Sequence, residues 1–91
     1  MCGGRGEIVR SLAGHDRGAV FCILGFEGEF LLLADGKERP VGRPKRKNRR
    51  HVALLGPFQH PVLERLEQGE TVLDSELRRA LAAFRDEWSR R

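Results

Sequence analysis

Short apolar runs separated by glycine-containing turns predict a series of β-strands in the first half of the chain. Residues 6–12 are rich in β-branched side chains, residues 19–27 place apolar side chains on both faces of an extended segment, and residues 30–34 form an apolar run of strand length. Runs of this length bounded by turn residues are typical of a small all-β domain. The apolar residues on both faces of 19–27 further predict a strand that is covered on both sides.

The segment that follows carries prolines and predicts the edge of the sheet. Asp35 and Gly36 both tolerate positive φ, which indicates a hairpin turn. Pro40 and Pro44 exclude a central, fully paired strand. We therefore expect an edge strand near residues 39–42, then an extended basic loop, and a last strand at residues 51–55. Five short strands in such a short segment predict a small, strongly bent antiparallel barrel.

The pattern changes to a helical period in the last third of the chain. A proline at the start and Gly69 at the end indicate a helix of about two turns over residues 61–69. A second helix is predicted with Asp74 as its N-cap. Its apolar stripe consists of Leu77, Leu81, Phe84 and Trp88. Because a lone helix of this length is marginal in water, the stripe is expected to pack on the barrel or, alternatively, to bind a partner protein.

Length and composition indicate one small domain. A chain of 91 residues with 40% hydrophobic content can form one core but not two. We expect residues 1–5 to be a flexible N-terminus, residues 6–55 the barrel, and residues 56–91 a helical C-terminal extension. No apolar run reaches the roughly 18 residues of a membrane span, and the N-terminus lacks the apolar core of a secretory signal. The sequence therefore predicts a cytoplasmic protein without a membrane partner.

Positive charge is concentrated in the first half of the chain. The net charge is +4, and eleven Lys and Arg face six Asp and Glu up to residue 51, against six and seven after it. The density is highest in "RPKRKNRR", residues 43–50, where six of eight residues are cationic. Runs of this kind are often merely solvated. This one lies between predicted strands with no acidic block beside it, so we predict that it binds phosphates.

Two segments resemble a known family. Residues 6–24, "GEIVRSLAGHDRGAVFCIL", resemble a KOW motif, the strand-turn-strand unit of several ribosomal proteins and transcription elongation factors. The resemblance rests on Gly6, Val9, Gly14, Asp16, Gly18, Val20 and Ile23. Residues 32–52, "LLADGKERPVGRPKRKNRRHV", are similar to bacterial KOW-domain RNA-binding proteins related to the eukaryotic-type large-subunit ribosomal protein fourteen family. The resemblance implies an SH3-like barrel, RNA as the ligand, and association with ribosomal RNA, the ribosome or translation.

The candidate RNA ligands lie in the basic run and in the glycine-flanked turn. The run contains Arg43, Lys45, Arg46, Lys47, Asn48, Arg49 and Arg50. Its cations are expected to contact phosphates, and the Asn48 amide to reach a 2′-hydroxyl or a base edge. Arg17 and His15 are expected at the tip of the turn, facing the RNA backbone. His15 stands where such proteins often carry Arg or Lys. No pair of aromatic residues suggests a stacking platform, so weak sequence reading is expected.

Other classes of function find little support. The residues that could ligate a metal are Cys2, His15, Cys22, His51 and His60. Their spacing matches no zinc pattern, so we predict no metal and no cofactor. The carboxylates have plain turn, surface or cap positions, and no nucleophile and base pair is visible, so we predict no enzymatic activity and no small-molecule substrate. The alternative that remains is an SH3-like adaptor that binds other proteins.

Overall fold

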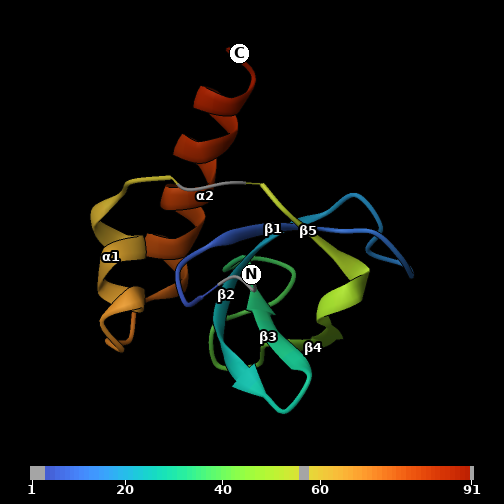
Figure 1. Ribbon diagram of the computed structural model, residues 1–91. Coiled ribbons are helices and arrows are strands. Elements are labelled where there is room, and N and C mark those ends of the chain that lie inside the picture. The colour runs from blue at the N-terminus through green and yellow to red at the C-terminus, as the bar shows by residue number, and fades with distance from the viewer. Residues whose placement is uncertain (1–3, 56–57, 91) are drawn as a thin grey trace.

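The computed structural model describes residues 4–55 and 58–90, and these form one sheet with two helices packed on it (Figure 1). The elements are β1 (Ile8–Ser11), β2 (Val20–Glu27), β3 (Phe30–Ala34), β4 (Lys45–Asn48), the 3₁₀ helix η1 (Arg49–His51), β5 (Val52–Leu54), α1 (Pro61–Glu67) and α2 (Asp74–Trp88). This arrangement confirms a small, mainly β fold followed by two helices.

The sheet is antiparallel throughout, with the strand order β4-β3-β2-β1-β5. Strands β1 to β4 follow one another as a meander, and β5 returns to pair with the free side of β1. The pairing of β2 with β3 shifts between Ile23 and Gly25, which marks a bulge. Among the described residues β4 and β5 remain the two edges of the sheet, so the sheet is not closed.

Strand β2 separates two apolar clusters, as the sequence predicts. Cys22 lies in the cluster that includes both helices, whereas Phe21 and Ile23 lie in the cluster on the opposite face of the sheet. All three side chains are buried. The helices therefore complete one hydrophobic core with the sheet and do not form a separate one.

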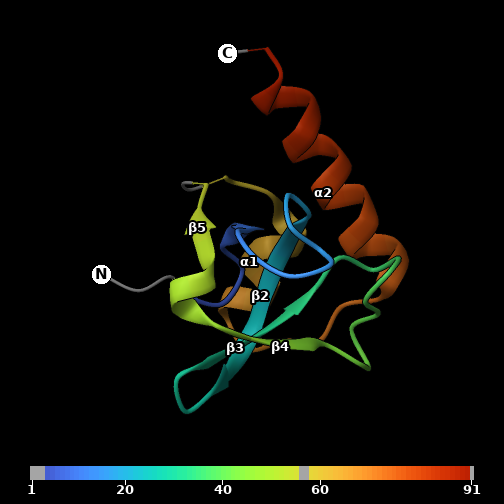
Figure 2. The ribbon, with the colours of Figure 1, turned by 90° about the vertical axis from the view of Figure 1, so that its right-hand side faces the viewer.

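Helix α2 contributes most of its apolar stripe to this core. Leu77, Leu81 and Phe84 are buried, as expected for a stripe that packs on the sheet. Trp88 lies one turn further on, where α2 extends past the sheet (Figures 1 and 2). Its ring stacks on Phe84 with the centroids 5.4 Å apart, and 43% of the residue is exposed.

Helix α1 starts at the predicted proline, whereas the cap of α2 differs from the prediction. The side chain of His60 accepts a hydrogen bond from the Val62 amide at 3.2 Å and so caps α1. Asp74 was expected to cap α2, but it is the first helical residue, and the Glu76 carboxylate accepts from the Leu73 amide instead. The Asp74 carboxylate is used elsewhere, because it accepts a hydrogen bond from the Val41 amide at 2.7 Å. That bond ties the loop between β3 and β4 to α2.

The predicted edge strand at residues 39–42 and the basic loop after it are wrong. Residues 35–44 form the loop, and the basic run itself supplies the edge strand β4, which pairs with β3 from Leu33 opposite Lys45 to Phe30 opposite Asn48. Pro44 ends the loop immediately before pairing starts. Cationic side chains are a common feature of edge strands because they oppose association with another chain.

The tight hairpin expected at Asp35 and Gly36 is also wrong. The Asp35 carboxylate accepts hydrogen bonds from the amides of Lys37 and Arg39, both at 2.9 Å, which closes a local turn but does not pair two strands. Gly36 has a φ of +79°, and a Cβ at this position would collide with the Asp74 carbonyl oxygen. The turn therefore serves to place the loop against the start of α2.

Some predictions concern residues outside the described part of the chain. These are residues 1–3 of the expected flexible N-terminus, including Cys2, and the first two residues and the last residue of the helical extension. In the described ranges, neither helix combines the length and the apolar character needed to cross a membrane.

Cys22 offers a chemical probe of unfolding. Its side chain is 0% exposed, and burial raises the pKa of its thiol to about 12, partly offset by the Gly6 amide. In a Cys2→Ser variant we therefore expect a thiol reagent to label Cys22 only when the protein opens, since the thiolate is the reactive form. The check is the labelling rate with and without denaturant. A native labelling rate equal to that of a free cysteine peptide would contradict the expectation.

Candidate nucleic-acid interface

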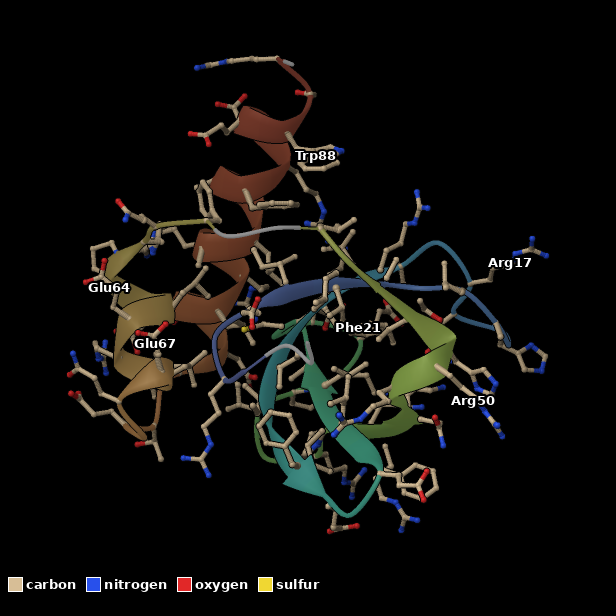
Figure 3. All side chains as sticks on the ribbon, in the orientation of Figure 1. Arg17, Phe21, Arg50, Glu64, Glu67 and Trp88 are labelled. Atoms are coloured by element: carbon tan, nitrogen blue, oxygen red, sulfur yellow. The ribbon has the colours of Figure 1, made fainter. Side chains whose placement is uncertain are left out.

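The turn between β1 and β2 presents two of the predicted ligands to solvent. Gly14 and Gly18 have φ values of +85° and +90°, which suit glycine and allow the chain to reverse sharply. The Gly18 amide donates to the Ser11 carbonyl at 2.8 Å, which closes the turn at its base. His15 and Arg17 are both exposed at the tip, and Figure 3 shows Arg17 pointing away from the body of the molecule.

Asp16, between these two residues, points inward and collects a cluster of polar groups. Its Oδ1 accepts hydrogen bonds from Ser11 Oγ at 2.8 Å and from Lys47 Nζ at 3.0 Å. Lys47 Nζ also donates to the carbonyl of Ala13 at 2.8 Å. On the other carboxylate oxygen, Oδ2 lies 3.0 Å from Lys45 Nζ without an aligned hydrogen bond, so this contact is an ion pair. We call Ser11, Asp16, Lys45 and Lys47 the ionic cluster.

The ionic cluster keeps Asp16 charged. Burial by itself raises the pKa of this carboxyl, but the contacts from Lys45, Lys47 and Ser11 outweigh burial and hold its pKa well below the ordinary value of 3.8. At neutral pH one carboxylate therefore faces two ammonium groups. The assumption that no acidic residue neutralises the basic run is wrong, because Asp16 reaches it from a turn about thirty residues earlier in the chain.

The alternation of side chains along β4 divides the basic run between two faces of the sheet. Lys45 and Lys47 stand opposite Leu33 and Leu31 and turn toward Asp16. Lys47 is only 8% exposed and Lys45 24%. The structure thus gives both ammonium groups an internal partner, and their contact with RNA stays a prediction.

Arg46 and Asn48 occupy the opposite face of β4. The Arg46 guanidinium carbon lies 4.5 Å from the centroid of the Phe30 ring, and its Nε lies 3.4 Å from a carboxylate oxygen of Glu27. The Asn48 Oδ1 accepts a hydrogen bond from the Arg50 amide at 3.0 Å and so caps η1. Neither side chain faces the ionic cluster.

Helix η1 brings the end of the basic run beside the β1–β2 turn. The Leu12 amide donates to the His51 carbonyl at 2.8 Å, which joins the two segments directly. The exposed Arg and His residues of the turn and of η1 are His15, Arg17, Arg49, Arg50 and His51, which we call the cationic rim. Figure 3 shows Arg17 and Arg50 on one side of the molecule and Glu64 and Glu67 of α1 on the opposite side.

Arg43 lies in the loop before β4 rather than on the cationic rim. Its side chain is exposed, and its amide donates to the Pro40 carbonyl at 2.9 Å. A groove of about 390 Å³ separates the loop from the β1–β2 turn, and its lining includes the carboxylates of Asp16, Asp35 and Glu38. Arg39 and Lys45 also line the groove, so its charges are mixed, whereas the rim carries no carboxylate among its five residues.

Three contributors to this surface were missed in the sequence. Ser11 and Phe30 lie in apolar runs, and Glu27 is the last residue of β2, so nothing local marks them. Only the register of β3 with β4 identifies the partners of Phe30 and Glu27. The period-two spacing of Lys45 and Lys47 was the signal that could have separated buried from exposed cations.

Nothing in the described ranges suggests a metal centre, because no three His, Cys, Asp or Glu residues there are grouped to hold an ion. The chain matches no protein-family model and no curated protein. The KOW resemblance therefore stays a prediction.

Proposed function

We propose that this protein is an SH3-like, KOW-type RNA-binding domain whose cationic rim contacts the phosphate backbone of ribosomal RNA. The observation that carries the proposal is the meeting of the β1–β2 turn with the basic run. Bonds from Lys47 to Ala13 and from Leu12 to His51 hold the two segments together. Two predicted ligand segments, distant in the sequence, thereby form one cationic surface.

The topology supports the SH3-like part of the proposal. Strands β1 to β4 form a meander, and β5, which follows a 3₁₀ helix, pairs with β1; this strand order is consistent with an SH3-like barrel. The glycines of the KOW-like segment also serve the geometry of the turn, because Gly14 and Gly18 both adopt positive φ. The resemblance in sequence and the strand order are thus consistent with each other.

The physical chemistry of the rim suits phosphate binding. The guanidinium groups of Arg17 and Arg50 can each donate two parallel hydrogen bonds to phosphate oxygens. The turn that carries Arg17 is held by the ionic cluster, so less conformational entropy is lost when it meets a ligand. Contacts of this type position RNA without reading its sequence. From the KOW resemblance we also infer a role in translation or ribosome assembly, in the cytoplasm and without catalysis.

The salt dependence of binding tests this mechanism. Lys45 and Lys47 are engaged internally, so we expect about three to four phosphate contacts and a fall of log K by about 2 to 3.5 per unit of log salt. Fluorescence anisotropy of a labelled RNA duplex at several salt concentrations measures the slope. A flat dependence between low and physiological salt would remove the electrostatic mechanism.

A matched pair of variants locates the contacts. Replacing Arg17 and Arg50 with Gln should reduce the salt slope by about 1.5, since two phosphate contacts are lost. Arg79→Gln removes one exposed charge from α2 and should leave the slope unchanged. If Arg79→Gln weakens binding as much as the rim variant, the protein is a diffuse polycation without a defined surface.

The second candidate is an adaptor that binds another protein through the end of α2. It is favoured by Trp88, which is 43% exposed where the helix extends past the sheet. Large aromatic residues often anchor protein interfaces. Purified protein that carries no nucleic acid and does not shift ribosomal RNA at low salt would favour the adaptor.

A further inference from the structure

The outer face of the β3–β4 pair carries three groups suited to a flat ligand. Phe30 stands directly opposite Asn48, and Arg46 is two residues before Asn48 on the same face of β4. This face is the one turned away from the ionic cluster, and the pair ends at the β2–β3 hairpin, far from the end of α2 (Figures 1 and 2). It is therefore distinct from both the ionic cluster and the exposed tryptophan.

The guanidinium of Arg46 has two partners that hold it in place, an aromatic ring and a carboxylate. Phe30 lies 4.5 Å below it, and the Glu27 carboxylate lies 3.4 Å from its Nε. The side chain nevertheless stays 57% exposed, so a second planar group has room to stack on it. Glu27 also offsets part of its positive charge, which makes Arg46 a weaker phosphate ligand than Arg17 or Arg50.

The neighbouring amide is oriented as a donor. The Asn48 Oδ1 accepts a hydrogen bond from the Arg50 amide at 3.0 Å, so its NH₂ group is the part of the side chain that can serve a ligand. A donor in this position suits an acceptor atom, such as a base carbonyl, a ring nitrogen or a ribose 2′-hydroxyl.

We propose that an unpaired RNA base stacks on Arg46 and forms a column with Phe30, while the Asn48 amide donates to the base or its ribose. Bases stack both on aromatic rings and on guanidinium planes, so one ring and one arginine suffice where no pair of aromatic residues is present. This inference rests on the proposed function and adds to it. It assigns RNA with an unpaired nucleotide beside a helix as the preferred ligand.

The test compares two RNAs and two conservative variants. The RNAs are a hairpin with an unpaired loop and a fully paired duplex with the same stem. Arg46→Lys keeps the charge and removes the plane, so we expect about tenfold weaker binding to the hairpin and a change within about twofold on the duplex. Arg50→Lys is the matched control on the rim and should weaken both complexes equally. Equal losses on both RNAs for Arg46→Lys would overturn the inference.

A direct readout of stacking accompanies the affinities. A 2-aminopurine placed in the loop should lose fluorescence when the wild-type protein binds, and lose less with Arg46→Lys or Phe30→Leu. Thermal melting of each variant excludes a folding defect as the cause. If the wild type binds both RNAs but no loop position responds, stacking is overturned while phosphate binding stands. If the wild type binds neither RNA at low salt, both proposals fail.

Discussion

Replacing Asp16 with Asn is expected to destabilise the protein by about 3 kcal/mol, the lower end of the range for removing one partner from a buried ion pair, because Asp16 is partly buried. Lys47 would remain in place with 8% of its side chain exposed and no counter-charge. Asn cannot replace the charge, although it can still accept the hydrogen bond from Ser11. Urea unfolding followed by circular dichroism measures the loss.

The exposed ion pair between Glu27 and Arg46 provides the control. Both side chains are more than half exposed, so Glu27→Gln should cost less than about 1 kcal/mol. If Asp16→Asn were no more destabilising than Glu27→Gln, the ionic cluster would contribute nothing to the fold.

Low pH should destabilise the protein by protonating the Asp16 carboxylate. Because the pKa of Asp16 is lower in the folded protein than its ordinary value of 3.8, its contribution is complete above that value and is lost as the pH falls below it. The wild type should therefore lose stability steeply below about pH 4, and Asp16→Asn should lose less over the same range. Parallel pH profiles for the two proteins would contradict this assignment.

Leu81→Ala should destabilise the protein by about 2–5 kcal/mol, the range for a large-to-small change in a packed core. Leu81 is 1% exposed and lies in the same cluster as Ile8 and Cys22 of the sheet. The substitution leaves a cavity between α2 and the strands, so the whole protein should unfold at lower denaturant. Denaturant midpoints of the variant and the wild type measure the effect.

Trp88→Ala is the matched comparison on the same helix. Because 43% of Trp88 is exposed, truncation should cost only about 1–2 kcal/mol, less than for a fully buried aromatic. Leu81→Ala with an unchanged midpoint would mean that α2 does not pack on the sheet in solution. A larger loss of stability for Trp88→Ala than for Leu81→Ala would mean that α2 packs on the sheet mainly through its C-terminal end, contrary to the structure.

Those parts of the fold that depend on local periodicity could be predicted from the sequence. The two-sided apolar pattern before Glu27 identified β2, and the helical stripe of Leu77, Leu81 and Phe84 identified the buried face of α2. Edge strand β4 was misplaced because its residues are polar, so no hydrophobic pattern marks them. Its pairing is decided by β3, an interaction between separate segments that local propensity does not contain.

The exposure of the β1–β2 turn was predictable from the sequence, but the division of the basic run into buried and exposed cations was not. The glycines around the β1–β2 turn indicated correctly that His15 and Arg17 would be exposed. The net charge of the basic run does not distinguish its buried cationic side chains from its exposed ones. The partner of Lys45 and Lys47 is Asp16, which becomes their neighbour only after the sheet has formed.

Because Lys45 and Lys47 are two residues apart, the register of β3 with β4 decides which charged side chains reach Asp16. A shift of one residue exchanges the two faces of a strand. Such a shift would turn Arg46 and Asn48 toward Asp16 and would separate Arg46 from Phe30. Inserting a single neutral residue inside β4 would therefore keep every cation in the chain and still dismantle the surface. Substitutions in β4 are therefore limited more by the positions of its charged residues than by how many it has.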